Sequence, residues 1–118
     1  MEKELVTVDS ILDYLQSAVE NKMPIPPAKW LDASAKLNVL LGAEDEEMYR
    51  LKQVVAQKRL DIFNGQQKRN VSAAKIEIEA SDEYRTMMRQ DARIKRIEEF
   101  IRIAKAQARL SEGEWKTY

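Results

Sequence analysis

The sequence predicts an all-α protein with a short N-terminal helix, a Pro-rich linker and a long antiparallel helical hairpin that resembles a coiled coil. Three observations favour this fold. Charged residues make up 34% of the 118 residues, and glycine and proline together number only six, which is typical of helical chains. Apolar residues recur at helical spacing in three segments, and a polar Asn-Gly turn separates the last two. The length suits one core, so we expect residues 1–118 to form a single all-helical domain.

The first helix is expected over residues 8–21, where the apolar residues fall on one face. Thr7 is suited to cap its N-terminus, because a threonine hydroxyl accepts a hydrogen bond from the first turn. Residues 22–27 contain three prolines. Because proline lacks a backbone donor and disfavours helical geometry in the residue before it, this segment is expected to be a linker. The apolar face consists of Val8, Ile11, Leu12, Leu15, Ala18 and Val19.

The second helical segment is expected over residues 28–63. Its apolar residues follow a heptad repeat, with Leu41, Met48, Val55 and Ile62 at one core position and Trp30, Leu37 and Leu51 at the companion position. Gly42 and the acidic run at 44–47 are a possible helix boundary, since acidic residues favour a first turn. The heptad register continues across the glycine. Two helices and one kinked helix therefore both remain open.

Asn64 and Gly65 begin a polar turn, and the third helix is expected as one segment over residues 71–110. Asn70 or Ser72 is suited to cap it. Its core positions are Ala73, Ala80, Met87, Ile94, Ile101 and Ala108, with Ile76, Ile97 and Ala104 at the companion position. Glu83 and Gln90 interrupt that companion position. Residues 111–118 lack periodicity and are expected to be a flexible tail.

The two heptad repeats define an expected hairpin and oligomer seam. It consists of Leu41, Met48, Val55, Ile62, Met87, Ile94 and Ile101. A two-helix hairpin leaves apolar surface uncovered, so we expect a homo-oligomer. Packing of the first helix against the hairpin is the alternative. The copy number does not follow from the sequence.

The absent residue types narrow the possible functions. The chain has no cysteine and no histidine, which excludes disulfides and thiolate nucleophiles and removes the usual general base. Glu44 and Glu47, with Glu79 and Asp82, have the spacing that a magnesium-dependent pyrophosphohydrolase needs. Antiparallel pairing about residue 67, however, places Glu47 more than one helical turn from Asp82. We therefore expect no enzyme activity, no cofactor and no metal site.

The sequence also gives an expected location. No signal-peptide h-region and no apolar stretch of about 18 residues occurs, so we expect a cytoplasmic protein without a membrane contact.

Charge is distributed unevenly along the chain. Residues 1–47 hold ten acidic and four basic residues, whereas residues 48–110 hold fifteen basic and eight acidic residues. An arginine row on a helix can follow a phosphate backbone, which makes the basic part a candidate nucleic-acid interface. The alternative is a solvated helix face with pairs such as Asp82–Arg85. The candidate contacts are Lys58, Arg59, Lys68, Arg69, Arg85, Arg89, Arg93 and Arg96. Tyr84, Trp115 and Tyr118 offer stacking surfaces.

Three segments resemble small helical proteins of tailed bacteriophages, in particular the UvsY-like recombination-mediator group. They are Lys29-Trp30-Leu31-Asp32, Leu60-Asp61-Ile62-Phe63-Asn64-Gly65 and Ala80-Ser81-Asp82-Glu83-Tyr84. The resemblance covers about residues 28–105. The aromatic and basic closing segment of the group is missing, and the tail from Trp115 to Tyr118 stands in its place.

The resemblance implies an oligomeric, non-enzymatic accessory that binds single-stranded DNA and assists a recombinase in the cytoplasm of the infected cell. Two other functions fit the same phage-like character. One is a small protein that binds and inhibits a host enzyme or defence complex, and the other is a coiled-coil component of the virion. The identity of the partner, and whether DNA or protein is the main ligand, stay open.

Overall fold

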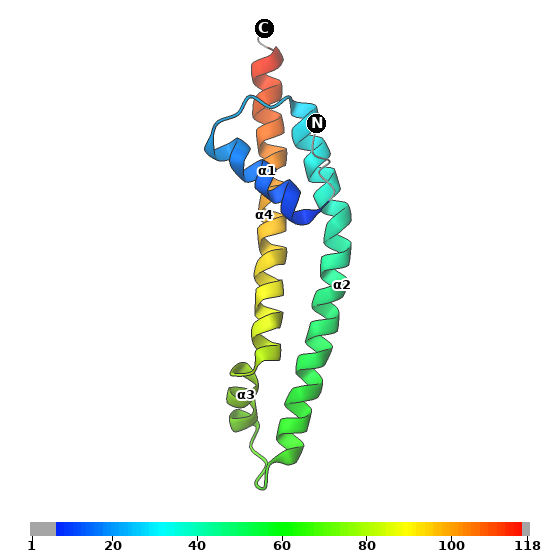
Figure 1. Ribbon diagram of the computed structural model, residues 1–118, viewed down its shortest axis with the longest axis vertical. Coiled ribbons are helices and arrows are strands. Elements are labelled where there is room, and N and C mark those ends of the chain that lie inside the picture. The colour runs from blue at the N-terminus through cyan, green and yellow to red at the C-terminus, as the bar shows by residue number, and fades with distance from the viewer. Residues whose placement is uncertain (1–6, 117–118) are drawn as a thin grey trace. The chain divides into compact units, whose positions relative to one another are not determined.

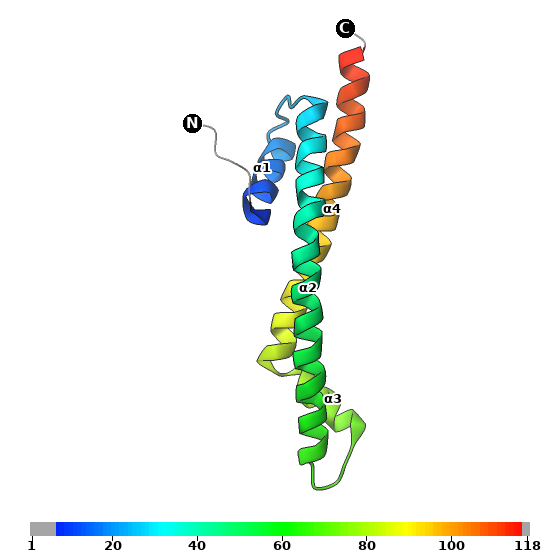
Figure 2. The same ribbon diagram turned by 90° about the vertical axis from the view of Figure 1, so that its right-hand side faces the viewer.

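The computed structural model describes residues 7–116, and side chains as far as Ser111. These residues form four helices and no strand: α1 (Val8–Glu20), α2 (Pro27–Gly65), α3 (Val71–Glu79) and α4 (Asp82–Lys116). Stretches of α2 and α4 run antiparallel beside each other (Figures 1 and 2). The all-α class and the helical hairpin predicted from the sequence are therefore confirmed.

The chain divides into two compact units. The α1 unit contains the described residues up to Gly42 and from Lys95 onward. The turn unit contains residues 43–94, including the turn that joins α2 to α3. Each unit has its own packing.

Helix α1 begins as the sequence predicts. The Thr7 hydroxyl accepts a hydrogen bond from the Ser10 amide at 3.1 Å, and the Ser10 hydroxyl accepts one from the Thr7 amide at 3.1 Å. This reciprocal capping box satisfies two backbone donors that the helix leaves unpaired. The helix ends at Glu20, one residue before the expected end. Lys22 follows with a φ of 49°, and the linker reaches α2 at Pro27, where proline is tolerated because the first helical residue donates no intrahelical bond.

The core of the α1 unit forms where α1 packs on α2 and α4 (Figure 1). Trp30 and Leu37 are buried as predicted. The neighbouring Leu31 is exposed, because the next residue on a helix points about 100° away. The buried cluster consists of Val8, Ile11, Leu12, Leu15, Ala18, Ile25, Trp30, Ala33, Leu37, Ile97, Ile101, Ala104 and Ala108. In this unit α1 thus covers apolar surface that α2 and α4 present.

Helix α2 is continuous through Gly42, which settles the open question about that residue. It has 39 residues and starts and ends slightly outside the expected 28–63. Apart from its chain neighbours and the backbone of its own helix, a Cβ placed on Gly42 would meet no described atom within 4 Å. The acidic residues that follow the glycine therefore lie inside a helix and do not begin one.

The prediction of one helix over residues 71–110 is wrong, because the helix breaks at Ala80 and Ser81. The Ser81 hydroxyl donates to the Ile78 carbonyl at 2.6 Å and accepts from the Tyr84 amide at 3.2 Å, which caps the start of α4. Asp82 and Glu83 lie in the first turn, where acidic side chains favour a helix N-terminus.

The break changes which residues are buried. The expected core residues Ala73 and Ala80 and the companion Ile76 are exposed, and α3 buries Ala74 and Ile78 instead. The start of α3 agrees with the prediction, since the Asn70 side chain accepts a hydrogen bond from the Ala73 amide at 3.1 Å.

The expectation of a flexible tail over residues 111–118 is also wrong for most of its length. Helix α4 continues to Lys116, so residues 111–116 are helical. Residues 117–118 lie outside the described part of the chain.

The predicted seam residues differ in burial. Ile94 and Ile101 are buried, whereas Leu41, Met48, Val55, Ile62 and Met87 are only partly buried. The innermost row on α2 is the companion position with Trp30, Leu37 and Leu51. On α4 the corresponding buried row is Ile97 and Ala104.

Candidate nucleic-acid interface in the turn unit

The companion row of the heptad becomes polar in the turn unit. Glu44 lies seven residues after Leu37, and Gln90 lies seven before Ile97. The Gln90 amide donates to the Glu44 carboxylate at 2.7 Å and to the Glu44 backbone carbonyl at 3.0 Å. Arg93 Nε donates to the same carboxylate at 3.0 Å. This polar layer joins α2 to α4. Glu44 and Gln90 lie equally far before and after residue 67, which is the antiparallel pairing predicted from the position of the turn.

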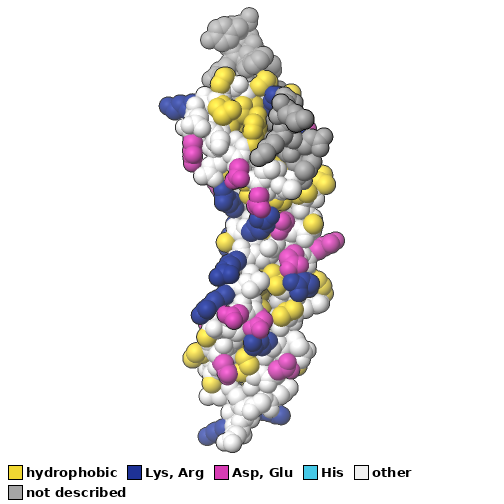
Figure 3. Space-filling view, viewed as in Figure 1, with side chains coloured by type: hydrophobic (Ala, Val, Ile, Leu, Met, Phe, Trp, Pro, Cys, Tyr) yellow, Lys and Arg dark blue, Asp and Glu magenta, His cyan; other side chains and the backbone are white. Residues whose placement is uncertain are grey.

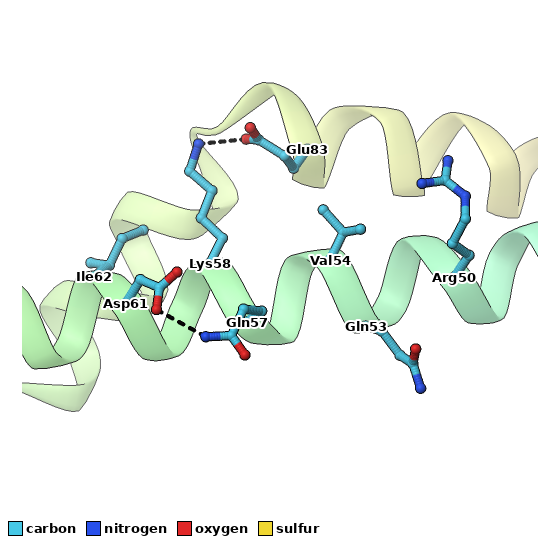
Figure 4. Close-up of a pocket in the computed structure, with 8 residues that line it drawn as sticks. All are labelled: Arg50, Gln53, Val54, Gln57, Lys58, Asp61, Ile62 and Glu83. Carbon is cyan, nitrogen blue, oxygen red and sulfur yellow. Dashed lines mark hydrogen bonds and ion pairs between the residues drawn. The ribbon is translucent and has the colours of Figure 1, made fainter.

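A second polar layer lies closer to the turn. Lys58 continues the same row on α2, and its ammonium group contacts the Glu83 carboxylate at 2.6 Å (Figure 4). The hydrogen bond from Lys58 lowers the pKa of Glu83 below its ordinary value. Between the two layers, Leu51 is buried. Lys58 is a candidate phosphate contact by its charge, but that charge is already paired within the unit.

An open groove of about 950 Å³ runs beside this second layer. Its lining residues are Arg50, Gln53, Val54, Gln57, Lys58, Asp61, Ile62 and Glu83 (Figure 4). Arg50 pairs with Glu47 at 2.6 Å, and this hydrogen bond lowers the pKa of Glu47. The Gln57 amide donates to Asp61 at 2.9 Å. The groove is lined by two cations and two carboxylates. Both cations already have an ion-pair partner, Glu47 for Arg50 and Glu83 for Lys58. The groove therefore does not offer a phosphate site.

The turn between α2 and α3 presents cations to solvent. Lys68 and Arg69 are exposed, and the Arg69 guanidinium lies 5.8 Å from the centre of the Phe63 ring, a cation–π arrangement. The Gln66 side-chain carbonyl accepts a hydrogen bond from the Asn70 backbone N–H at 2.7 Å, which fixes the chain between them. Arg59 is exposed near the end of α2. Residues 58–75 hold five basic residues and one acidic residue, Asp61.

The predicted arginine row on α4 has mixed surroundings. Arg85 and Arg89 are exposed, with Arg85 3.7 Å from Asp82 in the intrahelical pair that the sequence suggested. Arg93 is partly buried against Glu44. Arg96 belongs to the α1 unit, where it donates to the Gln16 side chain at 2.6 Å. Its guanidinium also lies 5.8 Å from the centre of the Phe100 ring.

The surface seen in Figure 3 carries acidic and basic side chains side by side, without one continuous basic field. Of the aromatic residues expected to stack with bases, Tyr84 is partly buried. The side chains of Trp115 and Tyr118 lie outside the described part of the structure. The cations best placed for an anionic partner are therefore those of the turn.

The four carboxylates whose spacing suggested a magnesium site do not form one cluster. Glu44 and Glu47 are engaged by separate cations, and Glu79 ends α3 whereas Asp82 begins α4. Among the described residues, no group of three acidic side chains is arranged to hold a metal ion. None of the helices between residues 7 and 116 is both long enough and apolar enough to cross a membrane.

The α4 half of the two polar layers is visible in the sequence, where Glu83 and Gln90 interrupt the companion row, but the sequence does not show which residues of α2 they meet. On α2 the signal is in the heptad row, where Glu44 and Lys58 alternate with Leu37 and Leu51.

The chain matches no protein-family model, no curated protein and no solved structure.

Proposed function

We propose that this protein is a non-enzymatic phage accessory that binds single-stranded DNA through the turn of its hairpin and assists recombination or replication as an oligomer. The observation that supports the proposal is the pair of exposed cations Lys68 and Arg69 in the turn. Arg59 adds a third exposed cation in the same unit.

The chemistry of the turn suits a flexible polyanion. Each cation that neutralises a phosphate releases bound counterions, so affinity falls as salt rises. Arg69 lies over Phe63, and no carboxylate among the described side chains forms an ion pair with its guanidinium. A single strand can follow such a turn more easily than a duplex, because its backbone bends freely and its bases are available for stacking.

The resemblance to recombination mediators supports the same assignment. The segment Leu60-Asp61-Ile62-Phe63-Asn64-Gly65 ends α2 immediately before the turn. Under this proposal the partners are single-stranded DNA, other copies of the chain and a recombinase, in the cytoplasm of the infected cell.

Helix α3 favours a second candidate function, the binding of a host protein. Val71 and Ile76 are 62% and 71% exposed on this short helix. Apolar side chains that a helix exposes to solvent are typical anchors for a protein partner. An inhibitor of a host enzyme or defence complex would use this helix and ignore DNA.

The test is fluorescence anisotropy of a labelled single-stranded oligonucleotide, titrated at several salt concentrations. We expect binding that weakens with salt, and a loss of about tenfold for Lys68→Glu with Arg69→Glu. Removing two phosphate contacts should reduce the slope of log affinity against log salt by about 1.4. The matched control, Arg102→Glu with Lys105→Glu, makes the same charge change at exposed positions of the α1 unit. No binding at low salt, or equal losses for both variants, would overturn the proposal.

A further inference from the structure

The part of α2 that leads to the turn carries cations without acidic residues between them. Residues 48–60 hold four basic residues and no acidic residue. Two of the four, Arg50 and Lys58, are paired within the turn unit. The other two, Lys52 and Arg59, are exposed, and none of the described carboxylates forms an ion pair with either. Because Lys52 and Arg59 are seven residues apart, they lie on one side of the helix, about 10 Å from each other along its axis.

Two aromatic side chains accompany these cations. Tyr49 is 65% exposed, and Phe63 is partly buried. Lys52 follows Tyr49 by three residues and Phe63 follows Arg59 by four, so each ring has a cation one helical turn away. The two rings are about 21 Å apart along the helix. We call the face formed by Tyr49, Lys52, Arg59 and Phe63 the α2 track.

The acidic residues of this part of α2 lie off the α2 track or at its end. Asp61 is two residues from Arg59, which places it on the opposite side of the helix, where it lines the groove (Figure 4). Asp45 and Glu46 are exposed about one turn before Tyr49. Their charges repel a polyanion, so they mark the end of the α2 track that is farther from the turn.

The α2 track continues into the cations of the turn. The Arg69 guanidinium lies 5.8 Å from the centre of the Phe63 ring, and the exposed Lys68 precedes it in the chain. Cations and rings therefore alternate from the turn to Tyr49. Single-stranded nucleic acids are bound by cations that follow the backbone and by rings on which bases stack. An acidic peptide would match the cations alone.

We propose that single-stranded DNA held at the turn continues along the α2 track, with phosphates at Arg59 and Lys52 and a base stacked on Tyr49. The inference rests on the proposed function and adds Lys52 and Tyr49 to its contacts. It makes the bound strand longer than the turn alone can hold.

The length of the bound strand tests the proposal. Fluorescence anisotropy would compare oligothymidylates of about 4 and about 12 nucleotides on the full chain. We expect Tyr49→Ala with Lys52→Glu to weaken binding of the longer strand about tenfold and of the shorter strand less than about twofold. Lys68→Glu with Arg69→Glu should weaken the binding of both. Lys105→Glu, at an exposed position of the α1 unit, is the control for the charge change.

The salt dependence and the pattern of losses separate this inference from the proposed function. Lys52→Glu alone should reduce the slope of log affinity against log salt by about 0.7 for the longer strand, because it removes one phosphate contact. If Tyr49→Ala with Lys52→Glu binds the longer strand as the unmodified chain does, while the variant of the turn is weakened, the α2 track is overturned and the turn remains the site. If the unmodified chain binds neither strand at low salt, the proposed function fails as well.

Photocrosslinking locates the stacked base. An oligothymidylate of about 12 nucleotides that carries 5-bromouracil should form an adduct with the peptide that contains Tyr49, because the excited base reacts with a ring in contact with it. Tyr49→Ala should lose this adduct. Both Tyr49 and Lys52 are exposed, so circular dichroism should show unchanged helix content in the variants. Adducts confined to other peptides would overturn the path along α2.

Discussion

The α1 unit and the turn unit use the same heptad row of α2 in opposite ways. In the α1 unit the row carries Trp30 and Leu37, which lie in a closed apolar cluster beneath α1. In the turn unit it carries Glu44, Leu51 and Lys58, and the two charged side chains bind partners on α4. One helix thus contributes a dry core to one unit and two polar layers to the other.

The difference teaches how the number of covering helices decides what a seam can tolerate. A third helix removes water from the seam, and an unpaired charge there would cost several kcal/mol. In the turn unit the polar layers keep contact with solvent, because Arg93 and Glu83 are only partly buried. Partly solvated polar layers contribute little net stability but fix register, since each has one partner across the hairpin.

The largest effect should come from truncating the same residue type in both units. Leu37 and Leu51 occupy the same heptad row, fourteen residues apart. We expect Leu37→Ala to lower the free energy of unfolding by about 3–5 kcal/mol, because the closed cluster cannot collapse around the cavity. Leu51→Ala should cost about 2–3 kcal/mol, because its surroundings can relax. Urea unfolding followed by circular dichroism measures both, and equal losses would remove the distinction between the units.

A smaller effect should come from the Glu44 layer. Glu44→Ala leaves the Gln90 amide and Arg93 without their shared acceptor, so we expect a loss of about 1–3 kcal/mol in the same unfolding experiment. The double variant Glu44→Leu with Gln90→Leu replaces the layer by apolar side chains. It should recover the loss or exceed the original stability, because a polar layer is weaker than a well-packed apolar one.

The double variant also tests what the layer is for. If Glu44 and Gln90 fix register, their replacement should broaden the amide signals of residues 43–94 in a heteronuclear NMR spectrum, while the signals of the α1 unit stay sharp. A spectrum that stays sharp throughout would show that the layer does not specify the pairing.

Most of the fold could be predicted from the sequence, because periodicity, proline and the Asn-Gly turn are local signals. The helix start at Thr7, the buried Trp30 and Leu37 and the hairpin all follow from them. The break at Ser81 does not follow from the periodicity, although a serine followed by two acidic residues is a helix-start signal. The six heptad positions from Ala73 to Ala108 indicate one uninterrupted helix instead, since alanine at Ala73 and Ala80 fits a core and a surface equally well.

The candidate interface could be predicted only in part. Charge counts identify the basic part of the chain, and the exposed Arg59, Lys68 and Arg69 belong to it. Charge counts do not tell a solvated cation from one that a distant carboxylate binds. Lys58 and Arg93 contact Glu83 and Glu44, which lie 25 and 49 residues away along the chain. Such pairs depend on tertiary register, which local patterns do not supply.

The smallest effect should be a pH dependence confined to the turn unit. Because the hydrogen bond from Lys58 lowers the pKa of Glu83 below its ordinary value of 4.5 in the folded state, the bridge stabilises the protein above that value. Its contribution is lost as the pH falls through the lowered pKa. The melting temperature of the unmodified chain should therefore exceed that of Glu83→Gln at pH 7. This difference should shrink below pH about 4.5.

Hydrogen exchange at the same pH values would place that effect in the structure. In the unmodified chain, protection near Lys58 and Glu83 should decrease on acidification. Around Leu37, the unmodified chain and Glu83→Gln should have equal protection at every pH. The effect should remain below that of Glu44→Ala, because both partners of the bridge are accessible to water and surface pairs are screened. If the difference in melting temperature between the two proteins does not depend on pH, Glu83 acts through packing and not through its charge. The turn unit would then be stabilised by packing, as the α1 unit is, and not by its ion pairs.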